Sequence, residues 1–345
     1  MATTTDLEQA QKDWALRVAR VLGAKNNGAS ASKPAESRVF HFSSVFHAGT
    51  GTFQPIEVAG LTSSVTAVEK ARRERRHALI LPREHGAWGL LLVPLVTGAG
   101  VALRESFHIT PVLLLLTAAL ALFWLRTPLE SLLGTSAMRA QTSDERKTVG
   151  WVIGGLSAVS ALALGSLLWA GRNPYLWLIG IAAAAAFAGQ ALLKKRGRSA
   201  RMLSEIVGTI GLTSSAPAAY YVITGQFNAI VWILWAANLM FAGNQIHYVQ
   251  LRLHSLRIDG LRAKLARGWD FAAGQAAMTL ALTLACVYGL LPQFASIAFA
   301  PILFRGWFYF IQKPRPLVVR ELGWSELKQA TAFCVLLIAA FALRQ

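Results

Sequence analysis

The stretch from Asn244 to His254 carries a dense group of amide and imidazole side chains at helical spacing. One helical face holds Asn244, His247, Leu251 and His254, and the adjacent stripe holds Gln245, Tyr248 and Arg252. Polar groups this concentrated at the end of an apolar segment predict a ligand-binding role, and the alternative is an ordinary helix end that turns amphipathic as it leaves a membrane. A metal site at His247 and His254 is not favoured, because they are two turns apart without a third ligand nearby.

Charged residues also open and close other apolar segments. Arg83 and His85 are available to an anionic head group, and the candidate ligand-binding residues in these places are Arg83, Glu84, His85, Arg126, Glu130 and Glu205. Each also has a structural interpretation: Pro82 and an acid suit a helix start, Arg126 can snorkel to an interface, and Glu205 suits a helix N-terminus. We expect these residues to form a polar rim together with Asn244, His247, Tyr248 and Arg252.

The elements that must position these residues are membrane helices. The 345 residues are 54% hydrophobic and 15% charged, and the mean hydropathy of +0.44 is typical of a membrane protein. This composition excludes a disulfide scaffold, a disordered chain and most soluble enzymes. The two cysteines lack CxxC spacing and indicate core positions. Nine apolar segments are expected, at 86–103, 110–125, 150–170, 174–193, 206–225, 227–245, 271–290, 293–311 and 329–343.

The net charge of +17 resides mostly in the connections between these segments. With the N-terminus inside, the cytoplasmic loops hold eighteen Lys and Arg residues, against three on the opposite side. This asymmetry predicts a cytoplasmic (inner) membrane protein with a cytoplasmic N-terminus and a C-terminus on the opposite side. It argues against a nucleic-acid partner, and it places the longer connections, where a working surface can form, on the cytoplasmic side.

The chain is expected to divide near residue 78. Residues 1–78 form a cytoplasmic extension with a short amphipathic helix at 5–22 and a linker at 23–37, and 79–345 form the multi-pass domain. The extension is predicted to be poorly ordered, with a helix lying on the membrane surface as the alternative. No apolar segment of a signal peptide follows the start.

A faint internal repeat links two of the expected spans. Pro94 and Gly98 follow an acid and a glycine in the first span, and Pro217 and Gly225 do so in the fifth. The repeat predicts an all-α bundle arranged as 4 + 4 + 1 helices around a shared cytoplasmic cavity.

The chain resembles the YwiC-like family of bacterial membrane proteins over residues 79–343. The resemblance rests on Pro82–Trp88 leading to Pro94 and Gly98, on Arg126-x-Pro128-Leu129, on the Glu205…Ala216-Pro217-Ala218…Gly225 span and on 244–257. It implies a membrane class and no particular activity.

More distantly, the chain is similar to the UbiA superfamily of membrane prenyltransferases. That resemblance implies nine helices, a cytoplasm-facing cavity, and two Asp-rich motifs after helices 2 and 6 that hold Mg²⁺ and a prenyl diphosphate. Here the first position offers Glu130 and then Asp144 and Glu145, and the second offers no acid until Asp259. Asn, Gln and His suit Mg²⁺ poorly. We therefore predict no cofactor, with Mg²⁺ expected only if the UbiA-like chemistry is retained.

Three functions stay open at this point. The sequence favours a protein that binds a lipid or isoprenoid-type ligand in a cytoplasm-facing cavity; Mg²⁺-dependent prenyl transfer is not expected, and a divergent prenyltransferase stays open. The alternatives are a transporter or permease, which needs facing helices broken by Pro or Gly, and a non-catalytic membrane scaffold.

Overall fold

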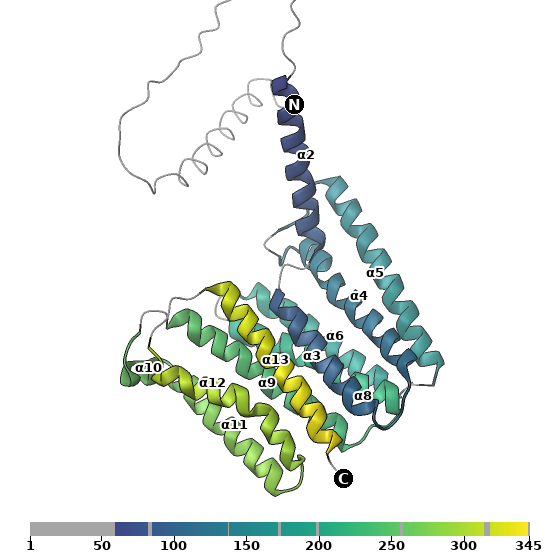
Figure 1. Cartoon of the computed structure of the whole chain (residues 1–345). Helices are drawn as coiled ribbons and strands as arrows, with labels where there is room; N and C mark the ends of the chain where they lie inside the picture. Colours follow the sequence, from purple (N-terminus) through teal and green to yellow (C-terminus); the bar gives the residue numbers. More distant parts are fainter. Residues whose placement is uncertain are drawn as a thin grey trace, which may run out of the picture. The chain divides into compact units, whose positions relative to one another are not determined.

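The structure is a computed structural model that describes residues 59–81, 85–136, 138–171, 174–197, 200–255, 258–313 and 318–343. The predicted amphipathic helix at 5–22 and the linker at 23–37 lie outside these residues. Ala59–Gln345 form one compact unit, and its described part is helical (Figure 1).

The helices follow one another with short connections. Their order is α2 (Ala59–Ile80), α3 (His85–Ala102), α4 (Ile109–Leu133), α5 (Ser143–Trp169), α6 (Pro174–Lys195), α7 (Arg201–Thr213), α8 (Ser215–Thr224), α9 (Ala229–His254), α10 (Leu261–Arg267), α11 (Trp269–Val287), the 3-10 helix η2 (Gln293–Phe299), α12 (Ala300–Ile311) and α13 (Val319–Ala342). Helix α2 crosses the expected boundary at residue 78.

Eight described helical segments are long and apolar enough to cross a membrane. Helices α7 and α8 together form one of them, as do η2 and α12, and the shorter apolar helix Ala87–Ala102 lies in α3. These positions match the nine predicted segments, so the prediction of an all-helical multi-pass membrane protein is confirmed. The last segment differs, because α13 begins at Val319 rather than near residue 329.

The span formed by α7 and α8 lies at the centre of the unit. Its most apolar window is 67% buried, against at most 39% for the other candidate spans. Every residue of α8 from Ser215 to Ile223 is buried. The main hydrophobic core surrounds α8 and includes Phe241, Phe299 and Phe333, with Phe241 and Phe333 stacked at a centroid distance of 4.1 Å.

Helices α3 and α8 pack against each other closely, and Figure 1 shows them side by side. Gly98 permits this approach, because a Cβ at this position would collide with the carbonyl oxygen of Ala216. Pro94 lies inside α3 and has no N–H to donate to the preceding turn. The Ser215 hydroxyl lies 3.0 Å from the Leu91 carbonyl in α3 and 2.8 Å from the Leu212 carbonyl in α7, and its one proton can go to either oxygen.

Candidate ligand-binding site

An ion pair lies within the membrane helices α12 and α13. Arg305 Nη1 donates to Glu326 Oε1, and the two side chains are only 12% and 16% exposed. Both residues belong to segments that qualify as candidate spans. Ionisable residues at such positions are costly to bury and usually mark a functional site.

Helix α9 completes the surroundings of this pair. The Arg305 guanidinium lies over the ring of Tyr248, 4.0 Å from its centroid. The Gln245 side-chain amide donates to the backbone carbonyl of Glu326 at 3.0 Å. The predicted stripe of Gln245 and Tyr248 therefore faces the ion pair, and the polar end of α9 takes part in the site.

Several buried polar atoms around the pair have no hydrogen-bond partner among the described residues. The donors are Arg305 Nε, Arg305 Nη2 and the Tyr309 hydroxyl, and the acceptors are Glu326 Oε2, Asn244 Oδ1 and Gln329 Oε1. Asn244 lies one turn from Tyr248 on α9, and Gln329 lies one turn from Glu326 on α13. A buried donor or acceptor without a partner costs about 1–3 kcal/mol, so these atoms have hydrogen-bonding capacity that ordered water or a ligand can fill.

Two further cations lie beside Tyr309. Arg252 is 5.7 Å from the centroid of the Tyr309 ring, and Lys264 Nζ is 5.1 Å from it. Lys264 is 3% exposed, and its ammonium donates to the carbonyl oxygens of Tyr309 (3.3 Å) and Gln312 at the end of α12. With Glu326 as the only carboxylate that these described contacts bring to the pair, the neighbourhood carries excess positive charge.

An aromatic cluster covers one side of this polar group. Its buried members are Tyr248, Leu251, Phe271, Tyr309 and Phe310. His247 lies at its edge, with its ring 5.3 Å from Phe271 and its Nε2 3.4 Å from Asp270 Oδ2. Cations next to apolar rings suit a ligand that has a charged head and an apolar tail.

Arg126 and Glu130 form a separate group with Lys194, near the ends of α4 and α6. Glu130 Oε1 accepts from Arg126 Nε at 2.9 Å and from Lys194 Nζ at 2.8 Å. Glu205 Oε2 accepts from the Gln250 side-chain amide at 2.6 Å, which links α7 to α9. No described contact joins Arg126 or Glu130 to the Arg305 pair. Arg83, Glu84 and the side chain of His85 lie outside the part that the structure describes.

Sequence analysis missed Glu326, because the last span was placed at 329–343, after it. A carboxylate opposite Arg305 was nevertheless to be expected, since a buried arginine needs a partner. Within the described residues, no group of three His, Cys, Asp or Glu side chains is placed to hold a metal ion.

Comparison with known protein families finds a similarity for part of the chain. Residues 81–220 match the family model of YwiC-like proteins. The YwiC-like stretch runs from the residues before α3 into α8 and contains Arg126, Glu130, Lys194 and Glu205, whereas the Arg305–Glu326 pair lies beyond it. No curated protein and no solved structure matches the chain, so the similarity to the UbiA superfamily stays a prediction.

Proposed function

We propose that the protein binds a lipid or isoprenoid-type molecule with an anionic head group, held at the Arg305–Glu326 pair between α9, α12 and α13. The observation that carries this proposal is the set of buried polar atoms without partners around an ion pair inside apolar helices. A phosphate head group accepts hydrogen bonds from Arg305 Nε and Nη2 and from the Tyr309 hydroxyl.

The charge balance favours an anionic head over a neutral or cationic one. Arg305 presents two nitrogens without partners in the described structure, while Arg252 and Lys264 stand beside Tyr309. The Glu326 carboxylate neutralises only one of these charges. The ring faces of Tyr248 and Tyr309 leave an apolar boundary for the first carbons of the tail.

The test is thermal unfolding of the detergent-purified protein with geranylgeranyl monophosphate, phosphatidylglycerol, phosphatidylcholine or geranylgeraniol, each with and without Mg²⁺. A ligand that binds only the folded state raises the unfolding midpoint. We expect a rise with the two anionic compounds that does not require Mg²⁺. A rise seen only with Mg²⁺ would instead support retained UbiA-like chemistry, and equal effects of all four compounds would contradict the proposal.

A double variant makes the test specific. Arg305→Met with Glu326→Leu removes both charges together, a change that replaces a buried ion pair by apolar side chains and often preserves stability. The matched control is Arg320→Met with Glu321→Leu, the same charge change at two exposed positions in the first turn of α13. The first variant should lose the rise with geranylgeranyl monophosphate and the control should keep it. A rise with geranylgeranyl monophosphate that survives in the first variant would place this ligand elsewhere.

Transport is the second candidate function, and a separate observation favours it. Pro94 in α3 and Pro217 in α8 lie in two helices that pack directly on each other, as the transport hypothesis requires. A single cysteine at Ser215, with Cys286 and Cys334 changed to Ser, tests this idea with a membrane-impermeant thiol reagent. Labelling from both faces of vesicles of known orientation supports a transport path, and labelling from one face or neither supports ligand binding alone.

A further inference from the structure

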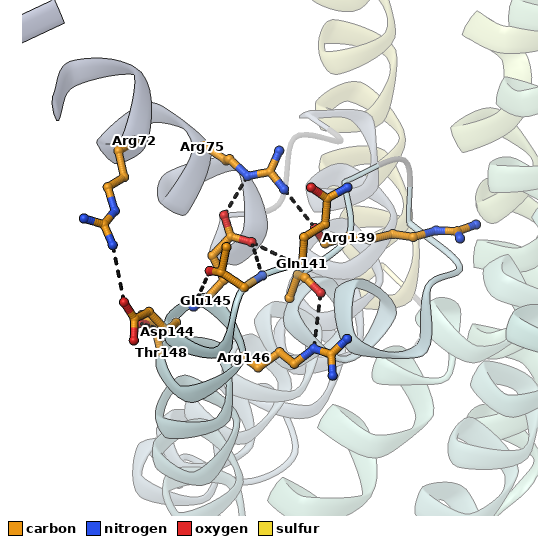
Figure 2. Close-up of polar contacts among 10 residues, drawn as sticks. Arg72, Arg75, Arg139, Gln141, Asp144, Glu145, Arg146 and Thr148 are labelled. Carbon is orange, nitrogen blue, oxygen red and sulfur yellow. Dashed lines mark hydrogen bonds and ion pairs between the residues drawn. The ribbon is translucent and has the colours of Figure 1, made fainter. Parts of the chain in front are cut away.

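Helix α2 is joined to the start of α5 by a partly buried ion pair. Arg75 Nε donates to Glu145 Oε1 at 2.6 Å, and Arg75 Nη2 donates to the Arg139 carbonyl at 3.2 Å (Figure 2). The other oxygen of Glu145 accepts from the backbone N–H groups of Gln141 and Thr142. The Glu145 carboxylate holds the pKa of Arg75 above its ordinary value, so this contact stays charged.

Hydrophobic contacts show how α2 is oriented relative to α5. Leu79 is 1% exposed and belongs to a cluster with Ala140 and Val149. Because Arg75 meets Glu145 while Leu79 lies in the cluster that contains Val149, α2 and α5 run in the same direction over this length. The last turns of α2 therefore lie along the first turns of a membrane span.

Trp124 marks the depth at which α2 ends. Its indole nitrogen, two residues before Arg126, the first charged residue of α4, donates to the Ile80 carbonyl at 2.9 Å. Tryptophan is enriched where the bilayer meets water, so the end of α2 lies near that interface. Arg76 and Arg73 precede Ile80 by one and two turns, which places them about 6–10 Å farther along the helix, at the height of lipid phosphates.

Positive charge gathers at this height. Residues 69–81 and 138–147 hold eight Lys and Arg against four Asp and Glu. Two of those acids are occupied, Glu145 by Arg75 and Asp144 by Arg72 at 3.4 Å (Figure 2). The cations left with exposed or half-buried side chains and no described carboxylate contact are Lys70, Arg73, Arg76, Arg139, Arg146 and Lys147. We call them, together with Arg72, the α2 surface.

One atom of this surface needs an acceptor from outside the described chain. Arg76 Nε is shielded from solvent and has no hydrogen-bond partner among the described residues. The Arg72–Asp144 pair is weak, because its side chains are 63% and 60% exposed. A phosphate oxygen can accept from Arg76 and Arg72 without breaking the Arg75–Glu145 contact.

We propose that the α2 surface binds the phosphate head groups of anionic phospholipids in the adjacent leaflet. Charge complementarity supports this partner, since each Lys or Arg near an anionic membrane surface contributes about 1 kcal/mol. The position next to Trp124 favours a lipid over a soluble acidic protein or nucleic acid, because lipid phosphates already lie at this height. The proposal is independent of the Arg305 site.

The experiment counts lipids retained by the full chain in native mass spectrometry, after purification from nanodiscs of equal parts phosphatidylglycerol and phosphatidylcholine. The test variant is Arg72→Gln with Arg73→Gln and Arg76→Gln. The matched control is Lys195→Gln with Arg196→Gln and Arg262→Gln, which removes three exposed cations from other connections. Helix content by circular dichroism confirms that both variants fold.

We expect the test variant to retain several-fold less phosphatidylglycerol than the control, with phosphatidylcholine unchanged. The retained phosphatidylglycerol should also fall as salt rises from 0.1 to 1 M, because exposed charges are screened. Equal losses in both variants would show a general charge effect and overturn the proposal. Displacement of the lipid by millimolar inorganic phosphate would show an anion site without lipid preference and would overturn it as well. The Arg305→Met with Glu326→Leu variant should retain phosphatidylglycerol at the α2 surface, which separates this proposal from the proposed function.

Discussion

Two ion-pair groups in the membrane helices bury charge in different ways. At the ends of α4 and α6, one oxygen of Glu130 accepts from both Arg126 and Lys194. Between α12 and α13, Arg305 and Glu326 share one hydrogen bond, and Arg305 Nε, Arg305 Nη2 and Glu326 Oε2 lack partners in the described structure. In the first group, hydrogen bonds from two helices fill the Glu130 oxygen. In the second group, buried donors and an acceptor stay available for hydrogen bonds to a ligand.

The two groups also differ in their relation to known proteins. The Glu130 group lies in the YwiC-like stretch of residues 81–220, and the Arg305 pair lies after it. A role shared with YwiC-like proteins would therefore concern the Glu130 group, while ligand binding at Arg305 would belong to the part of this chain that the family model does not cover. Variants that separate the two groups test this division.

The largest effect is expected for Glu326→Ala. It leaves the Arg305 guanidinium without its carboxylate inside the bundle, which should lower the free energy of unfolding by about 3–5 kcal/mol. The measurement is unfolding in detergent micelles with a rising fraction of sodium dodecyl sulfate. Glu321→Ala, at an exposed position on the same helix, is the control and should behave like the wild type. A loss as small as that of the control would show that Arg305 has another partner.

The second-largest loss of unfolding free energy is expected for Gly98→Ala. The added methyl group collides with the backbone of Ala216, and backbone atoms of a packed helix cannot move aside cheaply, so we expect a loss of about 1–3 kcal/mol. Gly150→Ala in α5 is the matched control, because a Cβ there meets nothing within 4 Å. The control should gain up to about 1 kcal/mol from helix propensity. Equal stability of the two variants would mean that α3 and α8 can separate without cost, which would favour the transport hypothesis.

Glu130→Gln should cost less than the loss of Glu326, about 1 kcal/mol by the same measurement. Arg126 and Lys194 are near the ends of their helices and can turn their charges toward the interface when the carboxylate is gone. The unfolding midpoint in the presence of geranylgeranyl monophosphate should still rise in this variant. Loss of that rise would move the ligand site from Arg305 to the Glu130 group.

The membrane helices could be predicted from the sequence because length and apolar composition determine them almost alone. The start of α13 could not, because residues 319–328 hold four charged side chains and average hydropathy therefore places the start of the span after them. Helical spacing contained the missing information: Leu322, Glu326, Phe333 and Leu337 recur at intervals of four and seven residues, and Phe333 and Leu337 are fully buried. Because Glu326 has the same helical spacing as Phe333 and Leu337, it lies on the helix face that points toward the core.

The contacts made by the predicted site residues could be predicted only in part, for a similar reason. Arg126 and Glu130 are four apart on one helix, so their contact follows from spacing. Their contact with Lys194, and that of Tyr248 with Arg305, join helices far apart in sequence and depend on how the bundle packs. A single sequence predicts which residues share a helical face, and it does not predict which face of another helix they meet.

The smallest effect is expected for Ser215→Ala, and it tests how α3 tolerates its proline. Pro94 removes one N–H from the helix, and the Ser215 hydroxyl can donate its proton either to the Leu91 carbonyl of the preceding turn, at 3.0 Å, or to the Leu212 carbonyl, at 2.8 Å. Hydrogen bonds between membrane helices contribute about 0.6 kcal/mol on average, so the loss should be of this order in the same unfolding measurement. Ser157→Ala, at an exposed position in α5, should change nothing. If Ser215→Ala matches that control, the α3 turn at Pro94 does not depend on α8, and the two helices are joined by close packing at Gly98 alone.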